Sequence, residues 1–195
     1  MYRYLQSCRV TIAVAVLAVL AWAIPTVSAA MEIDFHLINN GQWWRIWTGH
    51  LTHYDFDHLF WDLLMFVVLG TICERADPRR FPLKLIAIMT GVTIAVVVFC
   101  DGIVIYRGLS GVDTGLFVWF VIAQSRRCWI DRQRATAMLW SGALLALLGK
   151  LTFEAATGQT LFVDASGFAP LFESHLAGAG FGIGCYAMPI KTPKD

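Results

Sequence analysis

The stretch GLSGVDTGLFVWFVIAQSRR, residues 108–127, decides the fold. A glycine-permitted turn opens it, an apolar run follows from Ser110, and a charged patch at Arg126 ends that run. Gly111 and Gly115 are four residues apart, a spacing at which small residues let two membrane helices approach closely. The stretch therefore predicts a membrane helix that begins near Ser110 and packs tightly against a second helix.

The whole chain shares this apolar character. Of its 195 residues, 57% are hydrophobic and only 15% are charged, whereas about 25% of a soluble domain is charged. The net charge of +1 gives no sign of nucleic-acid binding. The five cysteines are scattered and include no CxxC pair, which argues against a disulfide framework or a zinc–thiolate site. The composition predicts one all-α membrane domain over residues 1–195.

Apolar segments recur along the chain, the first about as long as the 20 or so residues that cross a bilayer and most of the others shorter, as in a thinned bilayer or inside a bundle. They predict a bundle of six transmembrane helices with a long outer loop over 31–57. Trp43, Trp44 and Trp47 in this loop favour a position at the membrane interface. The predicted spans are about 10–30, 58–75, 84–102, 110–126, 135–153 and 175–190.

The first apolar segment has a second interpretation. Arg3 and Arg9 precede it and VSAA ends it, a pattern that also fits a cleaved signal peptide.

The Lys and Arg residues predict the orientation. With six spans and a cytoplasmic N-terminus, only Arg45, Arg107 and Lys150 lie outside. The positive-inside rule then places both termini in the cytoplasm. The cytoplasmic residues are Arg3, Arg9, Arg75, Arg79, Arg80, Lys84, Arg126, Arg127, Arg132, Arg134, Lys191 and Lys194.

Ser110 and His175 are the candidate catalytic pair. A serine at a helix N-terminus lies near free backbone N–H groups that favour a developing anion, but it needs a base within hydrogen-bond reach. His175 opens the last apolar segment, where Gly178 and Gly182, and also Gly180 and Gly184, have the four-residue spacing. Close packing of the two helices predicts that Ser110 and His175 meet. The alternatives are a Ser110 that only caps its helix and a His175 at the membrane interface.

A group of histidines and carboxylates precedes the second span. His58 and Asp62 share a helix face, with Asp57 as the expected N-cap, and His58 could donate a hydrogen bond to an oxyanion. The alternative is a metal site, although the spacing matches no HExxH motif. Its ligands would come from His50, His53, His58, Asp55, Asp57 and Asp62.

Taken together, these motifs resemble the rhomboid family of intramembrane serine proteases over residues 41–190. The landmarks are Trp44-Arg45, the GxSG string from Gly108 to Gly111, and the HxxGxxxG string from His175 through Gly178 to Gly182. The histidines His53 and His58 also occupy the junction at which the family has them. The resemblance implies a Ser110–His175 dyad, with the Ser110 N–H, His58 and Asp62 around the oxyanion, and no cofactor or metal. It also implies that the first span is retained.

The chain most resembles the rhombosortase branch of the family. GQWWRIWTGHLTHYDFDHL (41–59), YRGLSGV from Tyr106 and HLAGA from His175 carry this likeness. It implies a bacterial inner-membrane enzyme whose partners are the lipid bilayer and membrane-anchored exported proteins with C-terminal glycine-rich signals.

Two acidic residues depart from the family. Many rhomboids have asparagine where this chain has Asp62, and an ionised carboxylate cannot donate a hydrogen bond to an oxyanion. Asp62 could be protonated, or it could pair with His58 and leave the oxyanion to backbone N–H groups. Asp113 stands where the branch has an apolar residue, with Thr114 in place of a histidine; it could pair with a cation or be neutral. These departures motivate the alternative of an inactive rhomboid-like protein that binds membrane helices.

Overall fold

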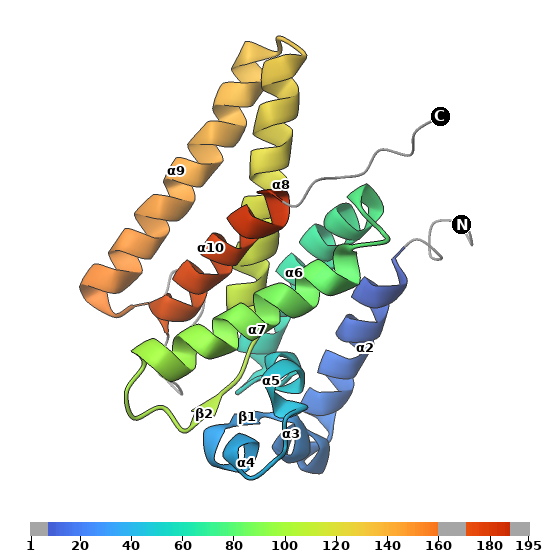
Figure 1. Ribbon diagram of the computed structural model, residues 1–195, viewed down its shortest axis with the longest axis vertical. Coiled ribbons are helices and arrows are strands. Elements are labelled where there is room, and N and C mark those ends of the chain that lie inside the picture. Colours follow the sequence, from blue (N-terminus) through green and yellow to red (C-terminus); the bar gives the residue numbers. More distant parts are fainter. Residues whose placement is uncertain (1–7, 160–170, 188–195) are drawn as a thin grey trace.

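The computed structural model describes residues 8–159 and 171–187 (Figure 1). A helix lies at each predicted segment, so the all-α class is confirmed. These helices are α2 (Arg9–Ala23), α6 (Phe56–Ala76), α7 (Phe81–Phe99), α8 (Ser110–Ile130), α9 (Arg134–Thr157) and α10 (Phe172–Ala187). Three of these helices, α6, α7 and α9, are long and apolar enough to cross a membrane. A fourth span results if α2 and α3 (Pro25–Met31) are one bent segment, and the count of six spans stays a prediction.

Several predicted boundaries shift. The second span begins at Phe56, because Asp55 accepts the His58 N–H at 2.8 Å and is the N-cap; the prediction that Asp57 caps the helix is wrong. Helix α10 begins three residues before His175, and the predicted end of this span at 188–190 lies outside the described residues.

The segment predicted as the first span, over 10–30, contains a break. Helix α2 ends at Ala23, and α3 leaves it at an angle of 118°. Pro25 causes the break, because proline has no N–H to donate and disfavours helical geometry at the residue before it. Ile24 accordingly has an extended backbone (φ −122°, ψ 99°), and Pro25 takes the first position of α3, where no N–H is needed.

The start of α2 is held by a residue from another helix. No side chain at its N-cap satisfies the first N–H groups. Instead, the buried Glu74 carboxylate at the end of α6 accepts the backbone N–H groups of Val10 at 3.0 Å and Thr11 at 2.8 Å. It also accepts the Thr11 hydroxyl at 2.7 Å. A negative charge at a helix N-terminus is favourable, so this contact fixes α2 against α6.

Helices α6, α7, α8 and α10 enclose the core, and Phe66, Ile88, Val92 and Leu116 are fully buried there. Helix α10 lies between α7 and α9, and α9 forms a long hairpin with α8 (Figure 1). The outer face of α9 exposes apolar side chains such as Leu139 and Leu145, which suits contact with lipid.

The outer loop packs over one end of the bundle. It contains β1 (Ile33–Asp34), α4 (Phe35–Asn39), α5 (Arg45–Thr48) and the 3₁₀ turn η1 (Gly49–Leu51). Strand β1 pairs in antiparallel fashion with β2 (Ile105–Tyr106), a short ladder that the sequence did not predict. Because β2 leads into Ser110, the ladder ties the outer loop to the start of α8 (Figure 1).

The Trp-Arg motif caps the end of α3. The Arg45 guanidinium is buried and donates to the carbonyl oxygens of Ala29 at 3.0 Å and Glu32 at 2.8 Å. The Trp44 indole N–H donates to the Ala30 carbonyl at 3.2 Å. The last carbonyl groups of a helix lack partners within it, so these donors supply what α3 needs. The motif therefore has a structural role in seating the outer loop.

Candidate active site

Ser110 is the first residue of α8, and the turn before it depends on glycine. Gly108 has φ +113°, a conformation that side chains disfavour. A Cβ at this position would also lie 2.7 Å from the His58 Nε2 atom and 3.1 Å from the Asp62 Oδ2 atom. Leu109 takes the N-cap position, so Ser110 is not the cap of its own helix. The turn thus presents Ser110 at the helix N-terminus, where unpaired N–H groups favour an anion.

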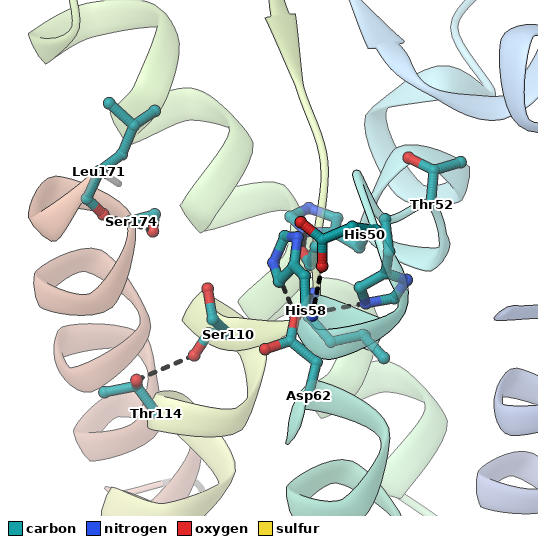
Figure 2. A network of polar contacts seen from close by, with 12 residues as sticks. His50, Thr52, His58, Asp62, Ser110, Thr114, Leu171 and Ser174 are labelled. Carbon is teal, nitrogen blue, oxygen red and sulfur yellow. Dashed lines mark hydrogen bonds and ion pairs between the residues drawn. The ribbon is translucent and has the colours of Figure 1, made fainter. Parts of the chain in front are cut away.

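Asp62 connects the turn before Ser110 to two histidines. One carboxylate oxygen, Oδ2, accepts the Leu109 backbone N–H at 2.7 Å. The same oxygen lies 3.3 Å from the Nε2 atoms of both His53 and His58. Figure 2 shows Ser110 between this cluster and Ser174 of α10. Asp62 thus accepts the Leu109 N–H and lies beside both histidine rings, an arrangement that fits the pairing role.

His58 is fixed on two sides. Besides its contact with Asp62, the ring stacks on Tyr54, with centroids 5.8 Å apart and an interplanar angle of 11°. The neighbouring His53 ring meets it edge-on at 5.0 Å. The ring therefore lies against Gly108, two residues before Ser110.

His50 contacts the turn before Ser110 through a backbone carbonyl group. Its Nδ1 atom lies 3.3 Å from the Gly108 carbonyl oxygen, and its Nε2 atom lies 3.0 Å from the Met89 carbonyl oxygen. The His50 ring thus bridges the outer loop, α7 and the turn before Ser110. Among the described residues, no three or more His, Cys, Asp or Glu side chains are placed to hold a metal ion. The metal alternative built on His50, His53 and His58 therefore has no common ligand set there.

Acid is expected to destabilise the fold through His50. Burial lowers the pKa of His50 to about 4, whereas an unfolded histidine titrates near 6.5. Between pH 4 and pH 6.5, His50 is therefore protonated to a greater extent in the unfolded chain than in the folded protein. The stability contributed by neutral His50 is therefore complete above pH 6.5 and falls as the pH drops toward 4, by about 3 kcal/mol.

The test is the melting temperature in detergent micelles between pH 7.5 and 4.5. His50→Asn should flatten the acid decline relative to wild type, and the exposed His36→Asn should leave it unchanged. Equal slopes in all three proteins would contradict the assignment.

His175 is buried near the start of α10, and its partner is a residue that the sequence did not single out. The Nδ1 atom lies 2.9 Å from the Oε2 atom of Glu154, in the last turn of α9. The other oxygen of Glu154 accepts from the Lys150 ammonium group. The sequence did contain a signal for Glu154, because Lys150 and Glu154 are four residues apart at the end of an apolar segment. Charged residues in membrane spans usually have a function.

Glycine brings α8 and α10 together, as the spacing predicts. A Cβ on Gly178 would lie 1.8 Å from the Gly111 carbonyl oxygen, and one on Gly182 would lie 2.3 Å from the Gly115 carbonyl oxygen. Gly180 and Gly184, in the other register, have nothing within 4 Å. A Cβ on Gly111 would also meet the carbonyl oxygen of Ser174, the residue before His175.

These contacts set Ser110 and His175 on adjacent turns of two touching helices. Within residues 8–159 and 171–187, no hydrogen bond joins the Ser110 hydroxyl to the His175 ring. Catalytic hydrogen bonds are often long before a substrate binds. The packing of α8 on α10 is therefore compatible with a Ser110–His175 dyad, although the hydrogen bond between the two side chains is not formed here.

Asp113 lies one helical turn after Ser110 and is buried. Neither carboxyl oxygen has a hydrogen-bond partner among the described residues. The expected pairing with a cation is therefore not observed, which leaves the neutral alternative.

The rhomboid domain family model matches residues 40–191. No curated protein matches the chain.

Proposed function

The chain belongs to the rhomboid family, and from this premise we propose that it is an intramembrane serine endopeptidase with Ser110 as nucleophile and His175 as general base. The family and the apolar helices make it a multi-pass membrane protein. The observation that carries the proposal is the glycine contact of α8 with α10, which sets the Ser110 turn beside the start of the helix that bears His175.

The proposed reaction follows from these positions. Ser110 attacks the scissile carbonyl carbon while the unprotonated Nε2 atom of His175 takes the hydroxyl proton. The resulting imidazolium then protonates the leaving amine, and water hydrolyses the acyl-enzyme by the same route. The backbone N–H of Ser110 donates to the oxyanion. Asp62 pairs with the His58 ring and accepts the Leu109 N–H, and so holds both the ring and the turn in place.

The substrate is proposed to be a membrane-spanning or C-terminally anchored exported protein. The likeness to the rhombosortase branch supports C-terminal glycine-rich sorting signals as the cleaved class. The same likeness supports a bacterial inner membrane, and the Lys and Arg distribution supports an orientation with both termini in the cytoplasm. The dyad would then face the outer side, where exported substrates arrive.

Labelling with a fluorophosphonate tests the proposal. Protein purified in detergent micelles should form one covalent adduct, which mass spectrometry should locate on Ser110. Absence of an adduct under conditions in which a known serine hydrolase reacts would favour the inactive helix-binding alternative. Chelation should leave the labelling unchanged, whereas it should abolish the activity of a metal-dependent hydrolase.

Asp62→Asn is expected to slow labelling by about tenfold. The Oδ2 atom of Asp62 accepts the Leu109 N–H and lies 3.3 Å from the Nε2 atoms of His53 and His58, and an uncharged amide oxygen is a weaker acceptor and ion-pair partner than a carboxylate. A hydrogen bond to a charged group contributes about 1.5–3 kcal/mol, so the turn that presents Ser110 should loosen.

The matched control is Asp57→Asn, which removes the same charge from an exposed position near the start of the same helix. It should label at the wild-type rate. Faster labelling of Asp62→Asn would mean that the carboxylate repels the oxyanion, contrary to the role proposed here.

A further inference from the structure

Helix α9 contributes one buried acidic side chain to the interior of the bundle. The buried residues of α9 are Ala137, Leu151 and Glu154, while most of the helix is exposed. Glu154 is 5% exposed although it sits on an otherwise apolar helix. A carboxylate in such a position is costly, which favours a specific role for it.

The two carboxylate oxygens of Glu154 have different partners. Oε1 accepts from Lys150, one turn earlier on the same helix, and Oε2 faces the Nδ1 atom of His175 across the α9–α10 contact. The pair with Lys150 is complete within α9 and does not need His175. The contact with His175 is therefore additional to the charge balance of Glu154.

This contact determines which nitrogen of His175 is free. A neutral imidazole has one N–H, and a carboxylate can only accept. Glu154 therefore favours the tautomer with hydrogen on Nδ1, which leaves the Nε2 lone pair as the base. It also places a negative charge beside the imidazolium that forms when Ser110 loses its proton.

We propose that Glu154 is a positioning residue for His175, so that Ser110, His175 and Glu154 form a triad with one residue each from α8, α10 and α9. This inference rests on the proposed function. Glu154 touches neither substrate nor the reacting atoms, and it acts through the orientation, tautomer and charge of the His175 ring.

Other titratable groups lie close to this pair and bear on its pH dependence. Lys150 contacts Glu154 directly on α9, and Glu173 of α10 faces Cys100 at the end of α7. Tyr106 of β2 approaches Ser174 and Ser110. Only Glu154 contacts the His175 ring among the hydrogen bonds and ion pairs of the described residues.

The test compares the pH profile of fluorophosphonate labelling for wild type, Glu154→Gln and Lys150→Gln. Replacing the carboxylate by an amide should slow labelling at pH 7.5 by 10²–10⁴-fold, the scale that follows when such a group is neutralised in serine proteases. The pH profile should also change shape, because the imidazolium loses its anionic neighbour. Lys150→Gln, which keeps the Glu154–His175 contact, should stay within a few-fold of wild type.

A second measurement does not depend on activity or on the stability of a variant. The ¹⁵N spectrum of histidine-labelled wild type, with His175 assigned from a His175→Gln sample, reports the tautomer directly. The inference expects hydrogen on Nδ1. Hydrogen on Nε2 in the wild type, or an unchanged rate and pH profile in Glu154→Gln, would overturn it.

The two proposals fail in different ways. If the proposed function is wrong, wild type does not react with the probe although His175 still carries hydrogen on Nδ1. If only the inference is wrong, wild type reacts at Ser110 and Glu154→Gln reacts equally well.

Discussion

Ser110→Ala is expected to reduce fluorophosphonate labelling and substrate cleavage to background, a loss of at least about 10³-fold. Without the hydroxyl no covalent adduct can form, and in well-studied serine proteases removal of the nucleophile costs about 10⁶ in rate. His175→Ala should cause a comparable loss, because an unassisted serine hydroxyl is a poor nucleophile at neutral pH. The two losses should not add in the double variant, since the residues act as one unit.

The control for this experiment is Ser125→Ala. Ser125 lies further along α8, where it bonds to Ser141 of α9 at 3.1 Å, away from the site. It should label like wild type. If His175→Ala retained full labelling while Ser110→Ala lost it, the serine would be reactive through another base and the dyad would be wrong.

Gly178→Ala is expected to destabilise the bundle by about 3 kcal/mol or more and to abolish labelling. The new Cβ would lie 1.8 Å from the Gly111 carbonyl oxygen, a backbone atom that cannot rotate away. Helix α10 would have to shift away from α8, and a displacement of this size belongs to the overpacking changes with the largest costs. The shift would also move His175 relative to Ser110, so activity should fall even where the protein still folds.

Gly180→Ala is the matched control for this prediction. It makes the same chemical change two residues along α10, where nothing lies within 4 Å. Alanine favours a helix over glycine by about 1 kcal/mol, so this variant should melt at or slightly above the wild-type temperature. The measurement is the melting temperature in micelles together with the labelling rate. Similar melting temperatures for the two variants would contradict the close packing of α8 on α10.

Some features of the fold could be predicted because they depend on local pattern. Apolar segments of sufficient length located all six helices, and the four-residue glycine spacing indicated the tight contact of α8 with α10. The break at Pro25 was not predicted, although the proline is visible in the sequence. A proline in an apolar run ends a helix as strongly within a membrane segment as elsewhere, unless neighbours compensate.

The roles of the acidic side chains could not be predicted, because they depend on which helices become neighbours. The sequence placed Asp62 near His58 but could not show that its oxygen would meet the Leu109 N–H, 47 residues away. Likewise, Glu74 caps a helix that begins 65 residues before it. A carboxylate can accept from any donor that packing brings to it, so its partner is a tertiary property.

The stretch from Gly108 to Arg127 by itself determined that a helix begins at Ser110 with a glycine face turned to a partner. Backbone geometry and small side chains fix that outcome locally. Only the tertiary structure decided that the partner is α10 in the register of Gly178 and Gly182, and that Glu154 of α9 reaches His175. Two glycine registers and many charged residues were equally available in the sequence, and the packing of three helices at one end of the bundle selected among them.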